Sequence, residues 1–236
     1  MKLFFGQIFP EVQVDDEEQQ HIVKVLRMRE GDEIAVTDGK GNAATGKIIF
    51  EGKKIRLEDL EILPETPEFK PKLHIAIAPT KNIDRIEFFV EKATEMGISE
   101  ISFLITEKTE RKNISIQKLR KQAISASKQS LRFHFPKLND LTKLTDFVKN
   151  IKCENTFIAH CESSFERIDL SELNKENSFE SYTFLIGPEG DFSQREIQML
   201  SELGIKAVSL GNQRLRTETA GVFVAAWNYY QSSDFR

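Results

Sequence analysis

An abrupt change of pattern around one proline-rich segment constrains the fold of this chain more than any other feature. Residues 64–71 (PETPEFKP) hold three prolines in eight positions and show no periodicity, which is typical of a segment between domains. Short alternating stretches with hairpin signals precede the segment, and apolar stretches alternating with amphipathic ones follow it. We therefore expect two domains, one over residues 1–68 and a larger one over residues 72–236.

The first domain is expected to be a small β-barrel. Alternating or β-branched stretches predict strands, which are separated by DGKGN and EGK, both hairpin signals. Asp15 and Asp16 can cap a helix whose apolar residues Ile22, Val25 and Leu26 follow helical spacing. The expected strands are residues 3–9, 33–37, 43–50 and 54–62.

The larger domain alternates strands with helices, which predicts an α/β fold with a mainly parallel sheet covered on both faces. The expected strands are residues 73–78, 101–105, 156–159, 182–186 and 207–210. The expected helices are residues 82–96, 116–130, 141–151, 196–203 and 217–230.

Charge is distributed unevenly along the chain. The formal net charge is −4, but residues 108–137 contain nine Lys or Arg against one acid, Glu110. A solvated helix face usually interleaves both signs, whereas phosphate backbones are bound by basic patches of this kind. The sequence therefore favours a nucleic-acid contact despite its acidic average.

Several classes of protein are disfavoured by the composition. No apolar run approaches the roughly 20 residues that cross a bilayer, and residues 1–12 lack the features of a signal peptide. The two cysteines, Cys153 and Cys161, match no zinc pattern, and the four histidines form no metal-binding pair. We expect a cytoplasmic protein with reduced thiols, no metal and no membrane contact.

Two glycine-containing segments follow predicted strands and mark the candidate site. They are residues 184–192 (FLIGPEGDF) and 208–220 (VSLGNQRLRTETA). Ligands of open α/β sheets bind where loops leave the carboxyl ends of strands, and Gly187, Gly190 and Gly211 would let main-chain atoms approach a ligand. The chain lacks a phosphate-binding P-loop, a dinucleotide fingerprint and a serine-hydrolase elbow.

These two segments resemble the cofactor loops of the SPOUT class of methyltransferases. Further segments resemble one family of that class, ribosomal RNA small subunit methyltransferase E, and they keep their order over nearly the whole chain. They are residues 21–32 (HIVKVLRMREGD), Lys81 with 91–97 (EKATEMG), Glu110 and Arg111 with 128–136 (KQSLRFHFP), 186–190 (IGPEG) and 210–220 (LGNQRLRTETA). The chain departs from the family at Asp191 and Leu131, where the family usually has glycine.

The resemblance implies a PUA-like RNA-binding barrel followed by a SPOUT domain with a C-terminal trefoil knot. It also implies methylation of ring nitrogen 3 of a uridine in 16S ribosomal RNA, a homodimer, and S-adenosylmethionine as cofactor. The cofactor would lie among the two glycine loops and a third loop after residues 156–159. The positions implied for cofactor binding are Leu185, Ile186, Gly187, Pro188, Gly190, Leu210, Gly211 and Leu215.

The chemistry of such a transfer suggests roles for further residues. A uracil N–H must lose its proton, so Arg216 is the candidate for stabilising the developing anion and Glu218 for accepting the proton. Glu218 is alternatively a favourable charge at a helix N-terminus, and Arg216 could instead bind a phosphate or pair with Glu218.

The candidates for contacting 16S RNA or the small subunit are Arg27, Arg111, Lys112, Lys128 and Arg132.

Two other functions stay open at this point. The chain could be a non-catalytic RNA-binding or ribosome-associated protein that keeps the fold without turnover. It could also be a SPOUT enzyme that acts on another RNA, such as a transfer RNA. Glu189, Arg216 and Glu218, present in the two motifs, favour an active enzyme.

Overall fold

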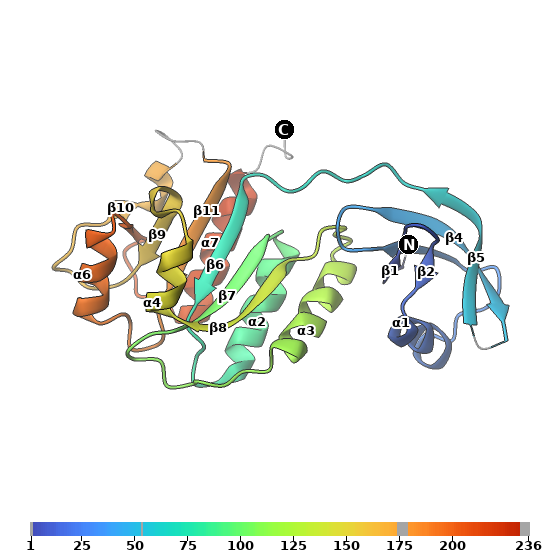
Figure 1. Ribbon diagram of the computed structural model, residues 1–236, viewed down its shortest axis with the longest axis horizontal. Helices are drawn as coiled ribbons and strands as arrows, with labels where there is room; N and C mark the ends of the chain where they lie inside the picture. The colour runs from blue at the N-terminus through green and yellow to red at the C-terminus, as the bar shows by residue number, and fades with distance from the viewer. Residues whose placement is uncertain (1, 53, 174–178, 232–236) are drawn as a thin grey trace. The chain divides into compact units, whose positions relative to one another are not determined.

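The computed structural model describes residues 2–52, 54–173 and 179–231, and the chain divides into two compact units (Figure 1). The first unit comprises Met1–Glu68 together with Ile124–Phe135. The second comprises Phe69–Ala123 and Pro136–Arg236. The sequence alone assigns residues 124–135 to the second domain, whereas the structure groups them with the first unit.

The first unit is built on a five-stranded sheet in the order β2-β1-β3-β4-β5. β1 runs parallel to β3, and the other neighbours are antiparallel. β2 also lies against β5, so the sheet curls into the nearly closed barrel expected for this unit. The strands are β1 (Leu3–Gln7), β2 (Gln13–Val14), β3 (Glu33–Thr37), β4 (Ala43–Glu51) and β5 (Lys54–Ile62).

The hairpin between β3 and β4 and the helix of this unit form for local reasons. The Asp38 carboxylate accepts hydrogen bonds from the Lys40 and Asn42 amides, and this closes the DGKGN turn. Asp15 caps α1 (Asp16–Gln20) by accepting from the Glu17 amide at 2.9 Å, and α1 continues into η1 (His21–Val25).

Residues 124–135 bind to the β3–β4 hairpin. The Gly41 amide donates to the Phe133 carbonyl and the Phe135 amide donates to the Gly39 carbonyl, each at 2.9 Å. The Phe5 and Phe135 rings lie 5.6 Å apart. This segment is therefore an integral part of the first unit.

The second unit contains a seven-stranded sheet in the order β10-β12-β9-β11-β6-β7-β8, in which every pairing is parallel. The strands are β6 (Lys72–Ile77), β7 (Glu100–Ile105), β8 (Lys137–Lys143), β9 (Thr156–Ala159), β10 (Ile168–Asp169), β11 (Ser181–Ile186) and β12 (Lys206–Ser209). The helices are α2 (Ile83–Glu95), α3 (Ile116–Gln129, which continues into the first unit), α4 (Leu144–Phe147), α6 (Gln194–Glu202) and α7 (Thr217–Gln231), with the short turns η2 (Val148–Asn150), η3 (Cys153–Asn155) and η4 (Leu170–Glu172).

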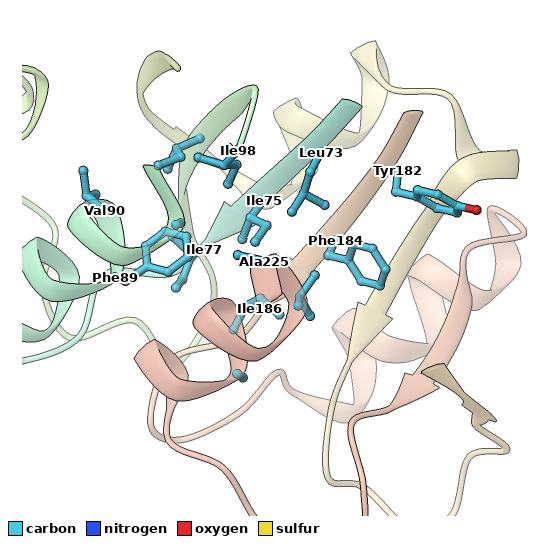
Figure 2. Close-up of a cluster of buried hydrophobic side chains, with 14 of the residues drawn as sticks. Leu73, Ile75, Ile77, Phe89, Val90, Ile98, Tyr182, Phe184, Ile186 and Ala225 are labelled. Atoms are coloured by element: carbon cyan, nitrogen blue, oxygen red, sulfur yellow. The ribbon is translucent and has the colours of Figure 1, made fainter. Parts of the chain in front are cut away.

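Helices cover both faces of this sheet, as the sequence predicts (Figure 1). Alternate residues of one strand enter different cores: Ile75 and Ile77 of β6 pack with α2 and α7, whereas Ala76 packs with α4 and α6. Figure 2 shows the first of these cores, where Phe184 of β11 and Phe89 of α2 lie on the same side of the sheet. In the described part of the chain, no helix has both the length and the apolar character to cross a membrane.

The prediction of a helix over residues 141–151 is wrong for residues 141–143. Residues up to Lys143 belong to β8, and only Leu144–Phe147 form an α-helix. Leu138 and Leu141 are three residues apart, so β8 lacks the two-residue alternation that predicts a strand. The two residues pair with Ile101 and Phe103, which are two apart, so the register between β7 and β8 is irregular here.

Candidate functional site

Three loops at the carboxyl ends of neighbouring strands enclose one cavity of about 280 Å³. The loops follow β9, β11 and β12, which lie side by side in the sheet. The volume is close to the lower end of the roughly 300–1,000 Å³ found for small-molecule sites. The lining residues are Ala159, His160, Cys161, Arg167, Ile186, Gly187, Pro188, Glu189, Asp191, Val208, Ser209, Leu210, Gly211, Gln213, Arg214, Leu215, Arg216, Thr217 and Ala220.

The loop after β11 is held by hydrogen bonds to its main chain. The Thr217 hydroxyl donates to the Gly187 carbonyl at 3.0 Å, and the Lys108 ammonium donates to the Gly190 and Phe192 carbonyls at 2.9 and 3.2 Å. A side chain at position 187 would place its Cβ 3.0 Å from the Phe192 ring. A side chain at this position would therefore fit only if Phe192 moved by a few tenths of an ångström.

The loop after β12 depends on glycine for a different reason. Gly211 has a φ of 116°, a conformation that other residues rarely adopt. Leu210 and Leu215 contribute apolar surface to the cavity on either side of this turn, and the exposed Arg214 and Arg216 contribute positive charge.

The loop after β9 contributes a buried histidine. Only 5% of His160 is exposed, and its Nδ1 accepts a hydrogen bond from the Glu162 amide at 3.2 Å. Burial lowers the pKa of His160, opposed by Asp191 and Glu162 and assisted by Arg167. The neutral ring then carries its proton on Nε2, a buried atom with no hydrogen-bond partner among the described residues.

Most of the residues proposed for cofactor binding meet at this cavity. Its lining includes Ile186, Gly187, Pro188, Leu210, Gly211 and Leu215. Leu185 points into the core on the α6 side of the sheet, and Gly190 lies against Lys108; neither lines the cavity. The two glycine loops therefore converge, as their positions after the strands predict.

The two candidate catalytic residues occupy different environments. Arg216 is exposed and lines the cavity, whereas Glu218 is 7% exposed and does not. Arg85 of α2 lies between two carboxylates: its Nε is 3.7 Å from Glu218 Oε1, and its Nη1 is 3.7 Å from Glu189 Oε1. The second oxygen of Glu218 is buried and has no partner among the described residues.

The candidate RNA-binding residues belong to both units. In the first unit Arg27 is exposed at a φ of 51°, Arg132 is half-buried, and Lys128 forms an ion pair with Glu18. In the second unit Lys112 is exposed.

Arg111 of the second unit has a structural role. Its guanidinium donates to the Thr80 and Lys81 carbonyls, the latter at 2.7 Å. It therefore holds the loop after β6.

Several of the residues that sequence reasoning missed lie on the loop after β9. That loop was expected to contribute, but His160, Cys161 and Arg167 carry no motif that distinguishes them from an ordinary turn. Arg85 was missed because it sits on an amphipathic helix, where a solvent-facing Arg is unremarkable.

Two family models and several relatives match this chain. A family model described as an RNA methyltransferase domain matches residues 67–228, and one described as an RNA methyltransferase PUA domain matches residues 14–57. Ribosomal RNA small subunit methyltransferase E of Aquifex aeolicus is 31% identical over 76% of this chain and 82% of its own length. The Rickettsia conorii protein of the same name is 29% identical over 91% of this chain and 88% of its own length.

Solved structures show the same fold. A probable rRNA-methyltransferase from Porphyromonas gingivalis has a TM-score of 0.88 at 32% identity, with all of both chains covered. Ribosomal RNA small subunit methyltransferase E from Neisseria gonorrhoeae, crystallised bound to S-adenosylmethionine, has a TM-score of 0.79 at 26% identity and covers 96% of both chains.

Proposed function

Because this chain belongs to the ribosomal RNA small subunit methyltransferase E family, we propose that it methylates ring nitrogen 3 of a uridine in 16S ribosomal RNA, with S-adenosylmethionine as methyl donor. The observation that carries the proposal is the convergence of the loops after β9, β11 and β12 on one cavity. A relative named ribosomal RNA small subunit methyltransferase E matches 91% of this chain, and a solved structure of a protein with that name has S-adenosylmethionine bound.

The cavity suits a donor with both polar and apolar parts. Ile186, Leu210 and Leu215 supply apolar surface, and the main chain around Gly187 and Gly211 supplies hydrogen-bonding groups. The buried Nε2–H of His160 is a donor that a bound molecule could satisfy. S-adenosylmethionine, when bound, supplies a methyl group on a cationic sulfonium. We propose that the residues lining the cavity hold it, with Leu185 and Gly190 supporting the loop from behind.

Arg216 is proposed to stabilise the negative charge that develops on the uracil ring as its N–H is lost. Its exposed guanidinium at the edge of the cavity can approach a base oxygen. For Glu218 two roles remain open: proton acceptance by its unpartnered oxygen, or a favourable charge in the first turn of α7. Its contact with Arg85 and its absence from the cavity lining favour the second role.

RNA recognition is proposed to use both domains, residues 1–68 as the PUA-like domain and residues 72–236 as the methyltransferase. The exposed Arg27 and Lys112 are free to contact phosphates, and Arg132 lies in the same basic stretch as Lys112. The base would be turned out of its stack to reach the cavity. Arg111 and Lys128 already have protein partners, so their contribution would be indirect.

Three further features are proposed on family grounds. The chain would form a homodimer, which the 45% exposed Phe223 on α7 and the 48% exposed Phe88 on α2 support. The chain around the two glycine loops would be threaded as a trefoil knot. The protein would act in the cytoplasm, where ribosomal subunits are assembled and where Cys153 and Cys161 would stay reduced.

The proposal is tested by measuring donor binding and methyl transfer separately. We expect the purified protein to bind S-adenosylmethionine in calorimetry and to methylate small subunits from cells that lack the gene, with the product located by mass mapping of 16S RNA. Arg216→Ala should keep the donor Kd within about threefold and lower kcat about a hundredfold or more, because a transition-state contact is lost.

Arg195→Ala, an exposed arginine on α6 outside the cavity, is the matched control and should turn over normally. Absence of donor binding would contradict the methyltransferase assignment. Turnover on transfer RNA but not on 16S RNA would contradict the substrate, and an Arg216→Ala enzyme with normal kcat would refute the role of that residue.

A further inference from the structure

Asp191, on the loop after β11, adopts a backbone conformation that is unfavourable for its residue type. Its φ is 61°, in the left-handed region where a side chain costs roughly 1–2 kcal/mol relative to glycine. Aspartate tolerates this region better than most residues, but glycine occupies it without cost. At this position, however, the side chain makes hydrogen bonds that a glycine could not make.

The carboxylate of Asp191 joins two walls of the cavity. Its Oδ2 accepts a hydrogen bond from the Cys161 amide at 2.8 Å, and its Oδ1 accepts one from the Phe192 amide at 2.8 Å. Cys161 follows β9 and Asp191 follows β11, and both residues line the cavity. Hydrogen bonds from an amide to a carboxylate are among the stronger ones in proteins.

Among the described residues, the loop after β9 is held by the Cys161 amide and by a small number of other hydrogen bonds, one of them from the Gln194 side chain of α6 to the Glu162 carboxylate at 3.3 Å. The Arg167 guanidinium donates to the His160 carbonyl at 2.9 Å, and the Glu162 amide donates to the His160 ring within the loop itself. The bond to Asp191 links the loop to the loop after the neighbouring strand β11. It thereby fixes the segment that carries the buried, unpartnered Nε2 of His160.

We propose that Asp191 is a positioning residue that clamps the loop after β9 to the loop after β11, so that the cavity is formed before the methyl donor arrives. The proposal rests on the proposed function for the identity of the donor. A preformed site avoids the entropic cost of ordering a loop on binding, so the clamp strengthens donor binding without taking part in the transfer.

Three substitutions separate the clamp from strain and from charge. Asp191→Gly removes both the strain and the carboxylate, and Asp191→Ala removes the carboxylate but keeps the strain. Asp191→Asn keeps one acceptor oxygen and the tolerance for positive φ while removing the charge. Leu131→Gly, at a φ of 55° in the first unit, is the matched control for relief of strain alone.

We expect the Gly and Ala variants to bind S-adenosylmethionine about tenfold more weakly, with a raised KM and an unchanged kcat. Asp191→Asn has a single acceptor oxygen that can serve only one of the two amides, so its affinity should lie between those of Asp191→Gly and the wild type. Leu131→Gly should bind like the wild type. Wild-type affinity in Asp191→Gly would overturn the clamp.

Hydrogen exchange of the donor-free protein provides a readout that does not depend on donor or activity. The Cys161 amide should be protected in the wild type and exchange at least tenfold faster in the Gly and Ala variants, while the amide of Ile158 in β9 is unchanged. Equal exchange of the Cys161 amide in wild type and Asp191→Gly would overturn the clamp. A protected Cys161 amide in a wild type that does not bind the donor would instead overturn the proposed function.

Discussion

Three helices of this protein end in the same backbone motif, but one of them lacks the usual residue. After α2 and α6, Gly97 and Gly204 each have a φ of 81° at the position that follows the helix. After α3 the corresponding residue is Leu131. The Leu131 amide donates to the Lys128 carbonyl, and the next amide, that of Arg132, donates to the Ser127 carbonyl. This is the Schellman pattern, which favours glycine because its φ is positive.

Replacement of Leu131 by glycine should therefore stabilise the protein. We expect Leu131→Gly to raise the free energy of unfolding by about 0.5–1 kcal/mol, because relief of the left-handed strain exceeds the added entropy of the unfolded chain. Little burial is lost, since Leu131 is 49% exposed. Urea denaturation measures the change. Leu131→Ala, which keeps a Cβ, is the control and should show no gain; equal gains in both variants would contradict the explanation.

At the scale of elements, α7 approaches α2 closely because of one glycine. A Cβ at Gly221 would lie 2.6 Å from the ring of Phe89 and 3.4 Å from Ile77 Cδ1. Both neighbours are fully buried in the core that Figure 2 shows, so neither can move cheaply. Helix propensity alone would favour alanine over glycine at this position by about 1 kcal/mol.

We expect packing to outweigh propensity at this contact. Overpacking by the added methyl group should cost about 1–3 kcal/mol, and the better helix propensity of alanine should return about 1 kcal/mol. Gly221→Ala should therefore lower the free energy of unfolding by about 1 kcal/mol. For a chain of this size the melting temperature would fall by about 2–4 °C. In a Phe89→Leu background the smaller side chain leaves room, and the same substitution should cost nothing. A higher melting temperature for Gly221→Ala in the wild-type background would show that α7 can move away from Phe89 at little cost, and would contradict this explanation.

The elements themselves were largely predictable, and the exceptions have physical causes. The helices α2, α3, α6 and α7 were expected within about two residues, because caps and apolar spacing mark them clearly. The strand β8 was missed because its apolar residues do not alternate with a period of two, and its register with β7 is irregular. The cavity followed from glycines after strands. The bond of Asp191 to another loop and the burial of His160 depend on the tertiary structure, which no local pattern encodes.

For the molecule as a whole, the half-buried His74 and the buried His160 make stability depend on pH. Burial lowers the pKa of His74, opposed by Glu100 and assisted by Lys137, and burial likewise lowers the pKa of His160. Below about pH 6.5 the unfolded chain therefore binds protons that the folded chain does not. Stability from these groups is fully present above that pH and is lost as the pH falls through it.

We expect the free energy of unfolding to fall between pH 7.5 and 5.5, by at most about 1.4 kcal/mol for each histidine. Urea denaturation at several pH values measures it. In the wild type, His74 Nε2 lies 2.8 Å from the Ser102 hydroxyl. A glutamine at position 74 can still form a hydrogen bond with that hydroxyl but does not titrate, so His74→Gln should flatten the dependence of the free energy of unfolding on pH. Profiles of wild type and variant that stay parallel across this range would show that His74 does not contribute.

The order of the strands has a consequence for biosynthesis. The cavity draws its walls from segments after β9, β11 and β12 and reaches as far as Ala220 in the first turn of α7. A nascent chain lacks the last of these walls until translation has passed that residue, even though β6 and β7 have long emerged. If the methyl donor binds in this cavity, as proposed, it cannot template the early steps of folding, and only a chain synthesised through the start of α7 can capture it.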